Sequence, residues 1–194
     1  IKMNNLGKKL NEIFRQEGQP WMMVSFLTPL FLAGLIPISE SMAGEVWVAN
    51  MKGANVQIID TGSNKVVKTI ATGAGAHNVT FSANGKLAYI ANLGTNSITI
   101  IDAMSKEILA NVVTDTKAHD VAVSPDGKLA VACNVGASNI TFIDVASKKA
   151  VHTMAAGKKA ITAVFSPDGK TLYVVNAGDA TISVVDVKTR KITE

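Results

Sequence analysis

The sequence predicts an all-β fold, a β-propeller of four-stranded antiparallel blades with one blade in every 42 residues. Three kinds of residue keep that interval along the chain without a slip. They are Asn50, Asn92, Asn134 and Asn176; Asp60, Asp102, Asp144 and Asp186; and Gly85, Gly127 and Gly169, each followed by Lys. A period of roughly 40–45 residues built from short β segments is typical of a propeller with one blade per repeat.

One repeat, residues 119–154, shows how the sequence encodes a blade. Its first strand alternates apolar and polar residues, and Pro125 and Gly127 supply the fixed φ and the positive φ of the tight turn that follows. The second strand is mostly apolar, as in a strand covered on both faces, and the third alternates at period two with many β-branched residues. The four expected strands are residues 120–124, 129–134, 139–144 and 150–154.

Polarity predicts the order of these strands within the blade. The first strand is short and carries small side chains, as a position near a crowded axis requires. The fourth strand, with Lys149 and His152, is the wettest and is therefore expected at the rim. Because each blade buries both faces against its neighbours, no blade should be stable alone.

The chain is expected to cover about three and a half to four blades. Counted from Val46, the first blade begins with its second strand and lacks its innermost one. The last blade reaches a short outer strand at Lys191 and Ile192. Since propellers usually have about four to eight blades, we expect a fragment of a longer ring, with about seven blades.

Residues 1–43 follow a different pattern. Basic residues precede an apolar run at residues 21–36, and the segment ends in Ser41-Met42-Ala43, with small residues at the two positions that flank a signal-peptidase cut. This pattern predicts a secretory signal peptide cleaved after Ala43, which leaves residues 44–194 as a periplasmic or secreted propeller with no stable membrane span. The alternative is an uncleaved anchor, although a run interrupted by Pro29 is short for a bilayer core of about 30 Å.

Composition excludes several classes of function. Lys and Arg are scattered, with a net charge of +4, and they form neither the basic stripe nor the stacking platform that nucleic-acid binding needs. Cys133 is the one cysteine, so an intrachain disulfide and a covalent haem motif are excluded, and its apolar surroundings predict a buried, inert thiol. No nucleophile elbow, His-Glu-x-x-His motif or acidic pair occurs, so we predict no catalytic residue and no metal centre, and a role without catalysis is favoured.

Short motifs within the repeats resemble a known family. They are Trp-Val-Ala-Asn at residues 47–50, Tyr-Ile-Ala-Asn at residues 89–92 and Tyr-Val-Val-Asn at residues 173–176, each followed by a turn and an Ile/Val-rich strand ending in Asp. Together with the strand and turn at residues 119–128, they resemble the YVTN-repeat β-propellers over residues 46–194. The family's Thr is replaced by Ala49, Ala91, Cys133 or Val175, and its aromatic residue by Val131, as packing substitutions.

The resemblance implies the fold closely and the function only broadly. The family includes extracytoplasmic binding proteins, surface-layer proteins and relatives of the haem-binding propeller of cytochrome cd-type nitrite reductase. A noncovalent haem is therefore an alternative to the expectation of no cofactor.

Two histidines and two lysines are the candidate ligand-binding residues. His77 and His119 lie one period apart on the link into the inner strand, near one mouth of the central channel that the predicted propeller encloses. Lys117 and Lys159 lie on the same kind of link. The histidines suit a metal, haem or small-molecule contact; alternatively, each ring hydrogen-bonds the neighbouring backbone and fixes the link between blades. The lysines form either a weakly basic rim or ordinary solvated turns. Ile161 takes the histidine position in the next repeat.

The repeated aspartates and asparagines are expected to build turns. Each Asp ends a third strand, where its carboxylate should accept backbone N–H groups of the following turn. Residues repeated on separate blades are badly placed for a catalytic carboxylate pair.

Three functions remain open. The favoured one is an extracytoplasmic scaffold without catalysis that binds an unidentified protein or small ligand. The second is a redox propeller with His77 or His119 as the axial ligand of a haem. The third is a lactone hydrolase, which requires acidic and basic residues that converge on the channel.

Overall fold

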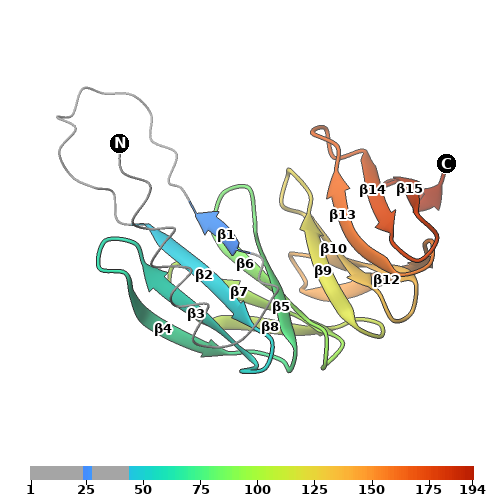
Figure 1. Cartoon of the computed structure of the whole chain (residues 1–194). Coiled ribbons are helices and arrows are strands. Elements are labelled where there is room, and N and C mark those ends of the chain that lie inside the picture. Colours follow the sequence, from blue (N-terminus) through green and yellow to red (C-terminus); the bar gives the residue numbers. More distant parts are fainter. Residues whose placement is uncertain (1–23, 28–43) are drawn as a thin grey trace, which may run out of the picture.

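The computed structural model describes residues 24–27 and 44–194 of the protein, and in these ranges the fold is all-β (Figure 1). The strands form four antiparallel sheets of four strands each, so the predicted fold class is confirmed. Within the same ranges, no helix is long and apolar enough to cross a membrane.

Each sheet is one blade, and its strands follow one another in chain order. Blade 1 contains β1 (Val24–Leu27), β2 (Glu45–Asn50), β3 (Asn55–Asp60) and β4 (Lys65–Ala71). Blade 2 contains β5 (Ala76–Phe81), β6 (Leu87–Asn92), β7 (Ser97–Asp102) and β8 (Ile108–Val113). Blade 3 contains β9 (Ala118–Val123), β10 (Leu129–Asn134), β11 (Asn139–Asp144) and β12 (Lys149–Ala155). Blade 4 contains β13 (Ala160–Phe165), β14 (Thr171–Asn176), β15 (Thr181–Asp186) and β16 (Lys191–Ile192).

The blades stand side by side in chain order, from the cyan sheet of blade 1 to the orange sheet of blade 4 (Figure 1). The inner strands β5, β9 and β13 lie next to one another, whereas β4, β8 and β12 are largely exposed. The strand order predicted from polarity, with the first strand innermost and the fourth strand at the rim, is therefore confirmed for blades 2 and 3, in which the sequence predicts all four strands.

The expectation that blade 1 lacks its innermost strand is wrong. β1 pairs antiparallel with β2, with Val24 opposite Val48 and Leu27 opposite Glu45. The inner edge of β2 offers unpaired backbone N–H and C=O groups, which an extended segment from outside the repeat satisfies. Apart from β1, residues 1–43 lie outside the described residues, so the signal peptide and its cleavage after Ala43 stay predictions.

Most of the core lies between neighbouring sheets, and one small cluster, formed by Val46, Val48 and Ile59, belongs to blade 1 alone. Three clusters of buried side chains fill the interfaces of blades 1 and 2, 2 and 3, and 3 and 4. Trp47 is the largest side chain of the first cluster, Tyr89 of the second and Phe142 of the third, and all three are fully buried. Each sheet therefore becomes stable by covering its apolar faces with the adjacent sheet.

The repeated aspartates close turns, as predicted. Asp60 accepts the backbone N–H of Ser63 at 2.6 Å, and Asp144 accepts that of Ser147 at 2.7 Å. The hydrogen bonds from the serine hydroxyls, followed by these backbone bonds, hold the pKa of both carboxyl groups below the ordinary value. The predicted positive φ of Gly127 is also confirmed, at 71°.

The repeated asparagines do more than form turns. Each ends the second strand of its blade, and its side chain reaches the third strand across the hairpin. Asn92 Nδ2 donates to Thr99 Oγ1 at 2.8 Å, and Asn134 Nδ2 donates to Thr141 Oγ1 at 2.9 Å. Since both asparagines are fully buried, these bonds satisfy Nδ2 donors that burial makes costly to leave unpaired, although no described residue donates to Asn92 Oδ1 or Asn134 Oδ1.

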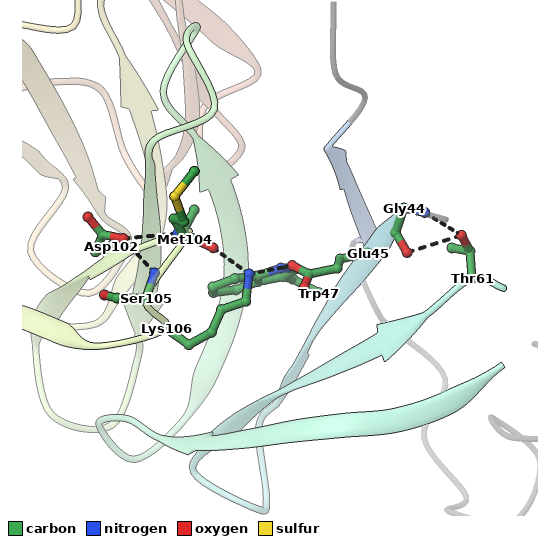
Figure 2. Close-up of polar contacts among 9 residues, drawn as sticks. Gly44, Glu45, Trp47, Thr61, Asp102, Met104, Ser105 and Lys106 are labelled. Atoms are coloured by element: carbon green, nitrogen blue, oxygen red, sulfur yellow. Dashed lines mark hydrogen bonds and ion pairs between the residues drawn. The ribbon is translucent and has the colours of Figure 1, made fainter. Parts of the chain in front are cut away.

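A group of polar contacts joins β2 of blade 1 to the turn between β7 and β8 of blade 2 (Figure 2). Lys106 Nζ forms an ion pair with Glu45 Oε2 at 2.6 Å, and the same carboxylate accepts the Trp47 indole N–H at 3.1 Å. Lys106 also lies 5.2 Å from the centre of the Trp47 ring, in a cation–π arrangement. The turn between β7 and β8 thus contacts a buried tryptophan of the neighbouring blade.

In blade 4, apolar side chains at the equivalent positions of the repeat are exposed, because no neighbouring sheet among the described residues covers them. Tyr173 and Ile182 stand one repeat after Val131 and Ile140, which blade 4 covers completely. Tyr173 is 41% exposed and Ile182 is 59% exposed. Burial at these positions therefore depends on the adjacent blade and not on the residue type.

Shortening one isoleucine in each setting tests this packing. Ile140→Ala should lower the free energy of unfolding by about 2–5 kcal/mol, because it removes buried methyl groups and leaves a cavity between blades 3 and 4. The matched change Ile182→Ala should cost less than about 1 kcal/mol. Urea denaturation followed by circular dichroism measures both values, and equal losses would contradict the assigned interface.

Candidate functional site

The inner strands position the candidate histidines through a repeated irregularity. In β5 the register with β6 shifts between Ala76 and Asn78, and β13 shifts likewise between Ala160 and Thr162. In β9 the partners of β10 jump from Asp120 to Ala118. His77, His119 and Ile161 are the extra residues at these bulges, which turn a side chain away from the regular pleat.

The two histidines connect successive blades. His77 Nδ1 lies 3.1 Å from the carbonyl oxygen of His119, and His119 Nδ1 lies 2.9 Å from the carbonyl oxygen of Ile161. The rings are in contact, with their centroids 4.1 Å apart. These hydrogen bonds to the neighbouring backbone are the ones that a structural role for the histidines requires.

The bonds also define the tautomer of each ring. A carbonyl oxygen only accepts, so Nδ1 carries the proton in both histidines, and in the neutral ring Nε2 is left as an acceptor. Burial lowers the pKa of His77, and the neighbouring His119 lowers it further, whereas the bond to the His119 carbonyl and the charge of Asp120 oppose this shift. His77 is therefore mostly neutral at pH 7.

A second row of polar contacts lies one residue further along the same strands. Asn78 Nδ2 donates to Asp120 Oδ1, and Thr162 Oγ1 donates to Asp120 Oδ2, so the row connects blades 2, 3 and 4. Asp120 Oδ1 also accepts the backbone N–H of Val121 at 2.8 Å. The residue is only 6% exposed, and these three bonds satisfy much of the acceptor capacity of its carboxylate.

A pocket of about 420 Å³ opens beside this row. Asn78 and Thr80 line it from β5, residues 120–123 from β9, and residues 163–165 from β13. Asp120 is its one ionisable lining residue, and most of the remaining wall is aliphatic or aromatic. Mostly apolar pockets with a few convergent polar groups are the usual form of a small-molecule site.

The four residues predicted for ligand binding fall near this pocket but do not line it. His77 and His119 directly precede the lining residues Asn78 and Asp120. Lys117 and Lys159 are exposed turn residues with φ of 60° and 53°. Their role in binding stays a prediction.

Sequence reasoning missed the row formed by Asn78, Asp120 and Thr162. The available signal was their common spacing of 42 residues, directly after the histidine position. Their chemical types differ, so the repeat was less apparent than for the identical asparagines and aspartates.

The histidines suit a metal or haem only in a limited way. Two axial imidazoles must stand on opposite sides of a haem plane, and rings in contact at 4.1 Å leave no room for that plane between them. One ring alone remains compatible, because its Nδ1 is held by a carbonyl and its Nε2 is an acceptor. Among the described residues, no group of three or more His, Cys, Asp or Glu side chains is placed to hold a metal ion.

Cys133 stands apart from this chemistry. It is fully buried in the interface of blades 3 and 4, and burial raises the pKa of its thiol well above the ordinary value. A thiol in this state is a poor nucleophile, which agrees with the predicted inert role.

The fold and its inner-strand site define a β-propeller. Residues 40–168 match the sequence model of the YNCE-like beta-propeller family, and the chain belongs to that family. The family membership agrees with the propeller resemblance seen in the sequence, while the YVTN assignment of the repeat itself stays a resemblance.

Among solved structures, the chain is similar to hydrazine synthase of Kuenenia stuttgartiensis, with a TM-score of 0.72 and 22% sequence identity. The similarity covers 77% of this chain and 45% of that one, so the protein spans less than half of its structural relative. At this identity the similarity concerns the fold alone. No curated protein matches the sequence.

The lowered pKa of His77 makes the stability of the fold depend on pH. The unfolded chain binds a proton on this ring near pH 6.5, and the folded chain binds it only at lower pH. Stability therefore rises with pH through this window and is lost as the pH falls toward the folded pKa. His77→Asn, which keeps a donor for the His119 carbonyl, should flatten the pH dependence between about pH 5 and 7.

Melting temperatures taken at intervals across that range check this expectation. His152→Asn, which removes an imidazole from the exposed outer strand β12, is the matched control. If His77→Asn retains the full pH dependence of the original protein, the lowered pKa of His77 is not the cause of that dependence.

Proposed function

We propose that the protein is a binding propeller without catalytic activity, which holds a small ligand in the pocket over its inner strands. The observation that carries this proposal is the pocket of about 420 Å³ that three successive blades build together. Its polar end consists of Asn78, Thr80 and Asp120, and its other wall is apolar, so it offers both orientation and burial to a ligand.

A catalytic role has less support in the same residues. General acid–base work at a pair of carboxyl groups needs two of them close together with different pKa values. The pocket contains one carboxyl group, that of Asp120, and no Lys or Arg lines it. A lactone hydrolase is therefore not favoured by the described part of the chain.

A redox propeller with haem on one histidine is the second candidate. It is favoured by the bonds that hold Nδ1 of His77 and His119 and leave Nε2 as a possible ligand atom. Addition of haemin to the purified protein tests it. A saturable Soret shift that is lost in His77→Asn or His119→Asn would support this function over simple ligand binding.

We also propose that the protein works outside the cytoplasm, on the signal-like pattern of residues 1–43. Fusion of this segment to alkaline phosphatase, which is active only after export, should give an active reporter. Mass spectrometry should find Gly44 at the mature N-terminus, and the mature chain would then lack β1 (Val24–Leu27), which pairs with β2 in the full chain. An inactive reporter, or a chain that retains the segment, would contradict this location or this cleavage.

Small probes test the proposed binding site directly. Three probes of similar size suit the pocket: 2-phenylethylamine, 2-phenylethanol and 3-phenylpropanoate. At least one should shift the methyl NMR signals of Val121, Val123 and Val164, which line the pocket, and not those of Val67 and Val151 on outer strands.

Filling the pocket provides the matched variant. Ala163→Phe places a ring in the wall of the pocket and should weaken probe binding at least about tenfold by excluding the probe. Ala83→Phe, in an exposed turn of blade 2, should leave binding unchanged. If no probe binds the original protein, or if both variants bind equally well, the proposed site is wrong.

A further inference from the structure

Asp120 is a buried carboxylate that forms an ion pair with no cation of the described residues. The ion pairs of the described residues are Lys106 with Glu45, Lys128 with Asp126, and Lys170 with Asp168. None of them involves Asp120, although its side chain belongs to a residue that is only 6% exposed. Buried charges in proteins are ordinarily paired with an opposite charge or a metal, so the missing partner is unusual.

The hydrogen bonds of Asp120 are distributed unequally over its two oxygens. Oδ1 accepts from the Asn78 amide and from the Val121 backbone N–H, which fills its two acceptor positions. Oδ2 accepts only from the Thr162 hydroxyl. One acceptor position on Oδ2 therefore remains, on a residue that lines the pocket.

The rest of the pocket determines what kind of group suits that position. No Lys or Arg lines the wall, so nothing there attracts an anion, whereas Asp120 favours a positive charge. Val123, Ala163 and Phe165 offer an apolar surface for the remainder of a ligand. Asn78 and Thr162 are already committed to Asp120 and keep its carboxylate in place.

We propose that the pocket binds a small organic cation, a protonated amine with an apolar body, whose ammonium group donates a hydrogen bond to Asp120 Oδ2. This inference rests on the proposed binding function and adds the chemical class of the ligand. A neutral hydroxyl could also donate a hydrogen bond to this carboxylate, but an ammonium group adds the Coulomb attraction of opposite charges, so the cation should be preferred over a neutral analogue of the same shape.

The comparison of 2-phenylethylamine with 2-phenylethanol measures this preference, since the two probes differ in the ammonium and hydroxyl groups. Isothermal titration calorimetry, or NMR titration for weak binding, should give about tenfold or greater preference for the amine at pH 7, because only the amine carries a positive charge opposite the Asp120 carboxylate. 3-Phenylpropanoate should bind more weakly than either.

Two variants identify the residue responsible. Asp120→Asn removes the charge with little change in size and should abolish the preference for the amine. Asp179→Asn, which removes an exposed carboxylate of a turn in blade 4, is the matched control and should keep it. Thermal melts show whether Asp120→Asn remains folded, because the new amide places a donor where Asn78 and Thr162 donate.

A second variant keeps the test decisive if Asp120→Asn unfolds. Val164→Lys adds a cation to the pocket wall at a residue that is 61% exposed and outside the polar row. It should weaken binding of the amine by a larger factor than that of the alcohol, because only the amine carries a charge that the lysine repels. Equal affinities for amine and alcohol in the original protein, or an amine preference that survives in both Asp120→Asn and Val164→Lys, would overturn the proposal.

Failure of the inferred ligand class can be distinguished from failure of the proposed binding function. If the alcohol or the carboxylate shifts the pocket signals at least as strongly as the amine does, the pocket binds ligands but the inferred cation class is wrong. If none of the three probes binds, the proposed function fails together with the inference.

Discussion

Mutual coverage of neighbouring sheets is the constraint on which the whole structure depends. Trp47, Tyr89 and Val131 occupy the same position in blades 1, 2 and 3, and each is fully buried by the following blade. Tyr173 holds this position in blade 4 and is 41% exposed. Burial raises the pKa of Tyr89 to about 12, and no described residue forms a hydrogen bond with its hydroxyl. The aromatic packing between blades thus outweighs the cost of an unsatisfied polar atom.

The same packing places the inner strands close enough to build a site. Coverage of the sheet faces holds β5, β9 and β13 side by side, and the bulges at His77 and His119 turn both rings toward the next strand's backbone. Asp120 in blade 3 then accepts hydrogen bonds from Asn78 in blade 2 and from Thr162 in blade 4. The polar rows fix the blades relative to one another, and the pocket beside them exists only because three blades keep this arrangement.

Much of the fold was predictable because the repeat encodes it locally. The turn aspartates, the Gly127 turn and the order of the strands follow from residue types at fixed spacing, and the structure confirms them. β1 was not predictable, because Val24–Leu27 lies outside the 42-residue pattern. The site was half predictable. The histidine links stood out as identical residues, whereas Asn78, Asp120 and Thr162 differ in type and meet only through contacts between blades.

Native-state hydrogen exchange measures most directly whether coverage by neighbours stabilises each blade. Blade 3 has both faces covered, and its strand β10 is buried along most of its length. Blade 4 has exposed side chains on β14 and β15. The account predicts that amides of β10 exchange much more slowly than those of β14, although the two strands occupy equivalent positions in the repeat. Equal protection of the two strands, or stronger protection of β14, would contradict it.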